Sequence, residues 1–125
     1  MTDTMKAKIY IGFDDWKDVE SQFQAALGPE PEIIYARYDQ GGYDGDANII
    51  FKRGDQWVYV RGGHCSCCGL EGQWSEDLFD PAGHLESVKQ GRREISMYDA
   101  GEDGRLELDR WIEWHSRPTI TKDTP

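Results

Sequence analysis

The chain has 125 residues, of which 24 are acidic and 14 are basic, so its net charge is -10 at neutral pH. Because proteins hold phosphate backbones mainly through lysine and arginine, this acidic excess argues against direct nucleic-acid binding. No stretch reaches the roughly 20 apolar residues that a membrane-spanning helix needs. The length suits one domain, and we expect a single α+β domain over 1–118 with a flexible C-terminal tail over 119–125.

The first part of the chain predicts a strand and then a helix. Residues 6–13 alternate between apolar and polar side chains, which would place Ile9, Ile11 and Phe13 on one face of a strand. The apolar spacing over 16–27 predicts a helix that is capped by an aspartate at 14 or 15 and ends before a Gly-Pro pair.

Three further strands are expected before residue 62. Residues 32–38 are rich in β-formers, and 47–53 and 56–61 form the clearest hairpin, joined through a Gly-Asp turn. The glycines and aspartates of 39–46 predict a loop between these elements. The order is therefore β-α-β-β-β, which indicates a small, mostly antiparallel sheet with a helix packed on one face.

The second part of the chain is less regular. Residues 62–74 predict a loop punctuated by glycine, and Pro81 and Gly83 are expected to restrict helix to a turn or two over 84–90. The apolar spacing over 106–115 predicts a C-terminal helix. Residues 99–110 resemble a calcium-binding EF-hand loop in outline, but glycine at 101 and arginine at 110 replace two ligands. An acidic turn before the last helix is the better interpretation.

The loop over 62–74 carries the densest group of potential metal ligands. These are His64, Cys65, Cys67 and Cys68. Thiolates and imidazole suit zinc, although a fourth ligand would have to come from His84, His115 or a carboxylate. A reactive thiol is a second interpretation, weakened by glycines that disfavour a helix after the cysteines. The third is a structural turn of reduced thiols.

The stretch over 63–74, G-H-C-S-C-C-G-L-E-G-Q-W, resembles a G-H-C-S-C-Y-G-L-E-G-Q-W stretch in a group of small tailed-bacteriophage proteins. Residues 43–47 are similar to a Tyr-x-Gly-x-Ala pattern of the same group. Cys68 replaces the usual tyrosine, which favours His64, Cys65 and Cys67 as ligands. The resemblance implies a phage or prophage origin and a role in the host bacterial cytosol against RNA polymerase, a nuclease, or a CRISPR or other defence complex.

We therefore expect a binding protein without catalytic residues or a required cofactor. Its carboxylates would meet the basic surface of a host protein, in places where nucleic-acid phosphates would otherwise lie. The candidate contact residues are Asp39, Tyr43, Asp44, Asp46, Glu102, Asp103, Glu107 and Asp109. A zinc-stabilised interaction module and a thiol-dependent enzyme remain as alternatives, and the acidic charge also serves solubility.

Overall fold

The computed structural model describes residues 6–41, 44–65, 68–92, 95, 97 and 100–117. Its helices and strands are, in chain order, β1 (Lys8–Ile11), α1 (Trp16–Phe23), β2 (Ile33–Gly41), β3 (Asp44–Arg53), β4 (Gln56–His64), β5 (Asp77–Leu78), α2 (Pro81–Lys89) and α3 (Gly101–His115).

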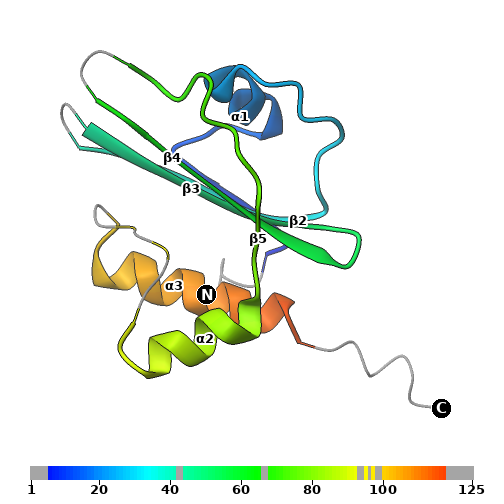
Figure 1. Ribbon diagram of the computed structural model, residues 1–125, viewed down its shortest axis with the longest axis vertical. Helices are drawn as coiled ribbons and strands as arrows, with labels where there is room; N and C mark the ends of the chain where they lie inside the picture. Colours follow the sequence, from blue (N-terminus) through cyan, green and yellow to red (C-terminus); the bar gives the residue numbers. More distant parts are fainter. Residues whose placement is uncertain are drawn as a thin grey trace.

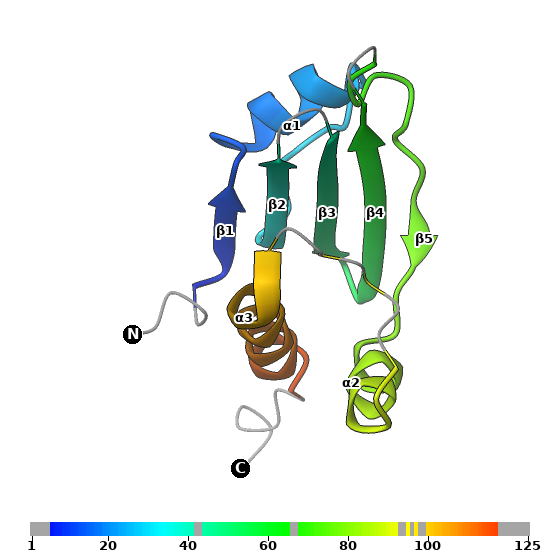
Figure 2. The ribbon, with the colours of Figure 1, turned by 90° about the vertical axis from the view of Figure 1, so that its left-hand side faces the viewer.

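The predicted α+β class is confirmed. The five strands form one sheet in the order β1-β2-β3-β4-β5, in which β1 is parallel to β2 and the other neighbours are antiparallel. Helix α1 lies on one side of the sheet, and α2 and α3 lie on the other (Figure 1). Viewed from another side, α3 runs below β1 and β2 while α2 lies below β5 (Figure 2).

Helix α1 begins where its sequence predicts and ends earlier. The carboxylate of Asp15 accepts a hydrogen bond from the backbone N–H of Asp18 at 2.9 Å, which caps the helix. The helix stops at Phe23 because Gln24 adopts a left-handed conformation with φ of 53°. Leu27 therefore lies beyond the helix, in the connection to β2.

The expectation that Phe13 shares a face with Ile9 and Ile11 is wrong. Strand β1 ends at Ile11, and Gly12 has a φ of +81°, which turns the chain. A side chain on Gly12 would collide with the carbonyl oxygen of Tyr38. As a result, Phe13 packs against Tyr38 in the core beneath α1, with their ring centroids 5.3 Å apart.

Two predicted loops are partly strand. Residues 39–41 extend β2 and residues 44–46 begin β3, so these six residues of the expected loop form one end of a long antiparallel pair. Strand β4 likewise continues through Gly62 and Gly63 to His64. A Cβ on Gly62 would lie 3.1 Å from Phe23 and 3.2 Å from Leu70, so this glycine lets both side chains approach the strand.

The two helices on the second face are longer than expected. Pro81 occupies the first turn of α2, where a missing N–H costs no hydrogen bond, and so begins the helix that it was expected to interrupt. Helix α3 starts at Gly101, so the described part of the predicted acidic turn is helical. Asp99 lies outside the described residues.

The sheet separates two hydrophobic cores. The first lies under α1 and includes Trp16, Phe23, Ile49 and Phe51. The second lies against α2 and α3 and includes Tyr35, Trp57, Phe79 and Trp111. Among the described residues, no helix has the length and apolar character needed to span a bilayer.

Candidate functional site

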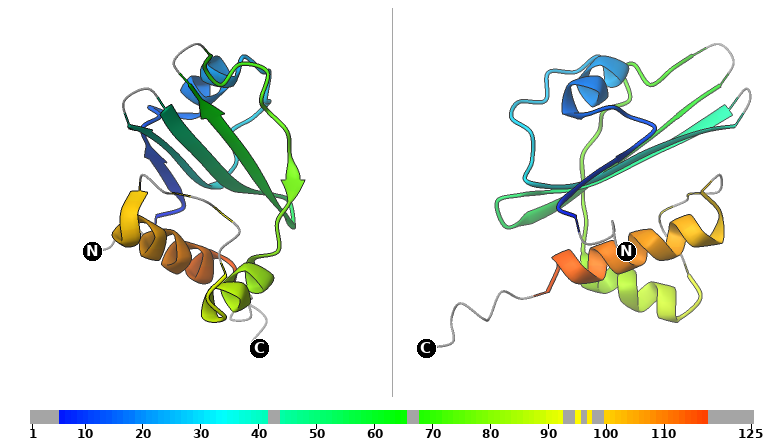
Figure 3. Two further views of the ribbon diagram at one scale, coloured as in Figure 1. Left: turned by 60° about the vertical axis from the view of Figure 1, so that its left-hand side comes forward. Right: turned by 180° about the vertical axis from the view of Figure 1, so that it is seen from behind.

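The sheet face that carries α2 and α3 changes from apolar to charged along the strands. Strand register places its side chains in successive rows across β2, β3 and β4. In order, the rows are Ile33, Lys52 and Trp57; then Tyr35, Ile50 and Tyr59; then Arg37, Asn48 and Arg61; then Asp39, Asp46 and Gly63. The charged rows lie toward the end of β2 and the beginning of β3. Figure 3 shows the sheet and the helices of this face from two further sides.

Arg37 connects β2 to α3 at this end. Its Nε donates to both carboxylate oxygens of Asp39, at 3.0 and 2.9 Å, and its Nη1 lies 3.8 Å from Oε1 of Glu107. The side chains of Arg37 and Asp39 are only 15% and 12% exposed, so salt screens their attraction less than it would a surface pair. A Cβ on Gly104 would lie 3.3 Å from the guanidinium, so glycine there lets α3 approach Arg37 closely.

Tyr35 joins the same network. Its hydroxyl accepts a hydrogen bond from Arg37 at 3.4 Å and donates to Glu107 at 3.5 Å. Burial raises the pKa of Tyr35 to about 12, although Arg37 opposes this rise. Burial alone would lower the pKa of Arg37, but its hydrogen bonds to Tyr35 and Asp39 outweigh that effect and raise it. The network therefore keeps a neutral phenol and a charged guanidinium at neutral pH.

Asn48 organises the neighbouring strands. It is 1% exposed in the middle of β3, where its Oδ1 accepts a hydrogen bond from the Tyr59 hydroxyl at 2.7 Å. Its Nδ2 donates to Asp46 at 3.3 Å. A buried amide needs such partners, so Asn48 helps to fix the position of the Asp46 carboxylate.

Six of the eight predicted contact residues lie on the two segments that Arg37 links, the β2–β3 pair and the first half of α3. We call Asp39, Asp44, Asp46, Glu102, Asp103 and Glu107 the acidic end. Asp44, Glu102 and Asp103 are exposed, whereas Asp39, Asp46 and Glu107 are partly buried. Two stretches that lie some sixty positions apart in the sequence thus meet through Arg37.

Of the other two predicted contact residues, the structure describes Asp109 alone. Asp109 is buried between α2 and α3, where its Oδ1 lies 3.0 Å from Nε2 of His84, so it is not an exposed contact. Tyr43 lies outside the described residues.

Sequence reasoning missed Arg37, Asn48 and Arg61. The available signal was the interruption of apolar strand segments by polar residues at alternate positions. Arg37 and Asp39 are two residues apart, as are Asp46 and Asn48, so each pair faces the same side of its strand. What the sequence does not contain is the strand register that puts these pairs beside one another.

Three of the four predicted zinc ligands are described, and they lie at the end of β4 or shortly after it. His64 is the last residue of β4, and its Nδ1 lies 2.6 Å from the Tyr38 hydroxyl. Cys65 and Cys68 are exposed, and the backbone N–H of Cys65 donates to the carbonyl of Cys68 at 3.1 Å. Cys67 lies outside the described residues. Across the described ranges, no cluster of three or more His, Cys, Asp or Glu side chains could hold a metal ion.

The histidines considered as a fourth ligand lie on the other side of the sheet. His84 packs against Phe79 in the second core, and Nε2 of His115 lies 3.1 Å from the carbonyl oxygen of Lys6. The ring of His64 instead packs on the first face, edge-on to Tyr38. It lies so close to Gly45 that a Cβ there would collide with it. The fold therefore brings neither His84 nor His115 to the cysteine turn.

Comparison with protein-family models, curated protein sequences and solved structures finds no match for this chain.

Proposed function

We propose that this chain is a binding protein that docks its acidic end on a cationic surface of another protein and catalyses no reaction of its own. The observation that carries the proposal is the bridge from Asp39 through Arg37 to Glu107. It links the β2–β3 pair to the first half of α3, and these two segments carry the six carboxylates.

The charge at this end supports attraction to a basic partner. Three described arginines lie near the six carboxylates along the chain or across the sheet. They are Arg37 on β2, Arg61 on β4 and Arg105 on α3. Arg37 binds Asp39, and Arg105 lies 3.3 Å from Glu102. The remaining negative charge adds to the field of a protein with a net charge of -10, which accelerates encounters with cations at low salt.

The resemblance of residues 63–74 to tailed-bacteriophage proteins extends this proposal to a class of partner. A phage protein of this kind would act in the host cytosol on RNA polymerase, a nuclease, or a CRISPR or other defence complex. Such complexes bind nucleic acid through basic surfaces, which are the surfaces that clustered carboxylates would fit.

The test uses a capped oligolysine peptide as the probe, with calorimetry at low and at high ionic strength. The variant Asp44→Asn/Glu102→Gln/Asp103→Asn removes three exposed charges from the acidic end. Its control, Asp55→Asn/Asp77→Asn/Glu86→Gln, removes three exposed charges elsewhere. We expect the first variant to bind about tenfold more weakly and to lose salt dependence, because each exposed charge pair contributes up to about 1 kcal/mol. Equal weakening by both variants would show that only net charge matters and would contradict the proposal.

A further inference from the structure

A groove lies at the opposite end of β3 from the acidic end, on the face that carries α1. A cavity of about 650 Å³ separates the α1–β2 connection from the end of β3, and its lining includes Trp16, Pro29 and Phe51. A second cavity of about 350 Å³ also borders Trp16, Pro29 and Glu30. The two cavities therefore flank one short segment of the connection, and we refer to them together as the groove.

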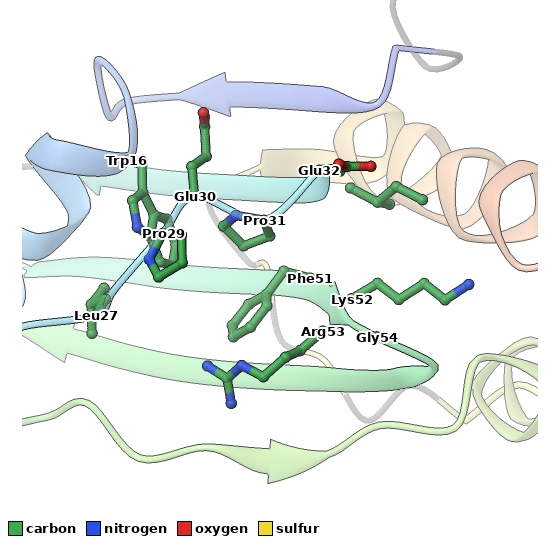
Figure 4. A pocket seen from close by; sticks show the side chains of 11 residues that line it. Trp16, Leu27, Pro29, Glu30, Pro31, Glu32, Phe51, Lys52, Arg53 and Gly54 are labelled. Carbon is green, nitrogen blue, oxygen red and sulfur yellow. The ribbon is translucent and has the colours of Figure 1, made fainter.

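The inner surface of the groove is apolar. In Figure 4, Trp16, Leu27 and Pro29 group at one end of the larger cavity, and Phe51 lies on the strand that forms its wall. The indole N–H of Trp16 donates to the carbonyl of Gly28 at 2.8 Å, which satisfies its polar atom and fixes the connection. Its ring lies 5.9 Å from that of Phe51. This surface suits an apolar side chain.

The rim of the groove carries several carboxylates. Glu30 accepts hydrogen bonds from the Tyr10 hydroxyl at 2.7 Å and from Lys8 at 3.0 Å, and these bonds lower its pKa. Glu32 is exposed and makes no hydrogen bond or ion pair with any residue in the described part of the chain. In the smaller cavity, Asp15 and Glu20 add two further carboxylates.

Most cations near the groove are already engaged. Arg53 binds both carboxylate oxygens of Glu76, at 2.8 and 3.0 Å. The ammonium group of Lys52 lies 5.9 Å from the ring of Trp57, which belongs to the other face of the sheet. Of the described basic residues that line the two cavities, Lys17 is the one that makes no such contact. An apolar groove with such a rim favours an occupant with an apolar centre and positive flanks.

We propose that this groove binds an extended peptide segment in which one large apolar side chain is flanked by lysine or arginine. The apolar side chain sits against Leu27, Pro29 and Pro31 above the rings of Trp16 and Phe51. The flanking cations lie beside Glu30 and Glu32. This site is distinct from the acidic end, since it lies at the other end of β3 and on the opposite face of the sheet. It does not depend on the function proposed above.

The test follows amide and indole N–H resonances while a capped KKFKK pentapeptide is added, with KKAKK and EEFEE as comparison peptides. We expect KKFKK to shift the Trp16 indole N–H and the amide N–H resonances of the non-proline residues in 27–33 and of 51–54 in a saturable way. KKAKK should bind there at least about tenfold more weakly, because it lacks the phenyl ring that the apolar surface would bury, and EEFEE should not bind. Equal binding of KKFKK and KKAKK, or shifts confined to the acidic end, would overturn the groove proposal without affecting the proposed function.

Two matched pairs of variants test the same site. Glu32→Lys should weaken KKFKK binding about fivefold, whereas Glu113→Lys, an equal charge change on the exposed side of α3, should leave binding within about twofold. Leu27→Trp fills the cavity and should abolish the indole shift, while Leu78→Trp, at a site that is 79% exposed, should preserve it. Equal effects within the charge pair would contradict the proposal even if Leu27→Trp failed to fold.

Discussion

His84 and Asp109 form a buried pair between α2 and α3, with Nε2 of the imidazole 3.0 Å from Oδ1 of the carboxylate. The other ring nitrogen of His84 is buried and has no hydrogen-bond partner in the described part of the chain. Asp109 therefore supplies the hydrogen-bonding partner of this histidine. Because the two residues are 25 positions apart, their pairing ties the two helices of the second face together.

We expect Asp109→Ala to lower the free energy of unfolding by about 2–4 kcal/mol, because it leaves a buried imidazole without its partner. Asp103→Ala, on the exposed side of the same helix, should change stability by less than about 0.5 kcal/mol. Urea unfolding measures both. The double variant His84→Leu/Asp109→Leu should be more stable than either single leucine variant, since it removes both polar groups together. Additive losses would contradict the coupling.

We expect Gly104→Ala to destabilise the protein by about 1–3 kcal/mol, although alanine ordinarily stabilises a helix. The new Cβ would lie 2.6 Å from the Cβ of Ala100 and 3.3 Å from the Arg37 guanidinium, which Asp39 and Glu107 hold in place. Gly83→Ala in α2 is the control, because its Cβ would meet the exposed side chain of Asp80, which can move. A stabilised Gly104→Ala in thermal or urea unfolding would show that α3 does not press on Arg37.

We expect Tyr10→Phe to raise the pKa of Glu30 toward the ordinary glutamate value, because the Tyr10 hydroxyl is the largest cause that lowers it. Carbon-13 NMR titration of the side-chain carboxyl measures this change, and Tyr35→Phe, on the other face, is the control. The depressed pKa means that Glu30 contributes stability above the unfolded-state pKa of about 4.3 and loses it as the pH falls through the folded-state value. An unchanged titration curve would count against the hydrogen bond.

We expect Ellman's reagent to modify Cys65 and Cys68 in the native protein, because both thiols are exposed. The variant Cys65→Ser/Cys68→Ser should lose two equivalents of this native labelling. Adding zinc before the reagent distinguishes the alternatives for the turn, because a metal site would protect the thiols at one equivalent of zinc. Labelling that occurs only after unfolding would contradict the exposure of the two side chains.

The sequence predicts the sheet well where its pattern is local. The alternating apolar residues on either side of Gly54 and Asp55 predict the β3–β4 hairpin. Asp15 predicts the start of α1, because its side chain caps the helix. These elements depend on neighbours within a few positions. Their prediction from sequence therefore succeeds.

Other features depend on contacts that the local pattern does not contain. Residues 39–41 and 44–46 of the glycine-rich segment are strand because they pair with each other, and residues 101–105 are helical although two glycines disfavour helix. The link from Arg37 to Glu107 spans 70 positions and the pair of His84 and Asp109 spans 25. Such partners become visible only when register and helix packing are known.

The turn at Gly12 allows one short segment of the chain to contribute to both hydrophobic cores. Before this residue the chain contributes Ile9 to one core, and immediately after it Phe13 enters the other. The edge strand β1 and the turn after it therefore contact the cores on both faces of the sheet. If the helices on either face unfolded, residues 9–13 would lose packing contacts. We therefore expect the protein to unfold in one cooperative transition and not one face at a time.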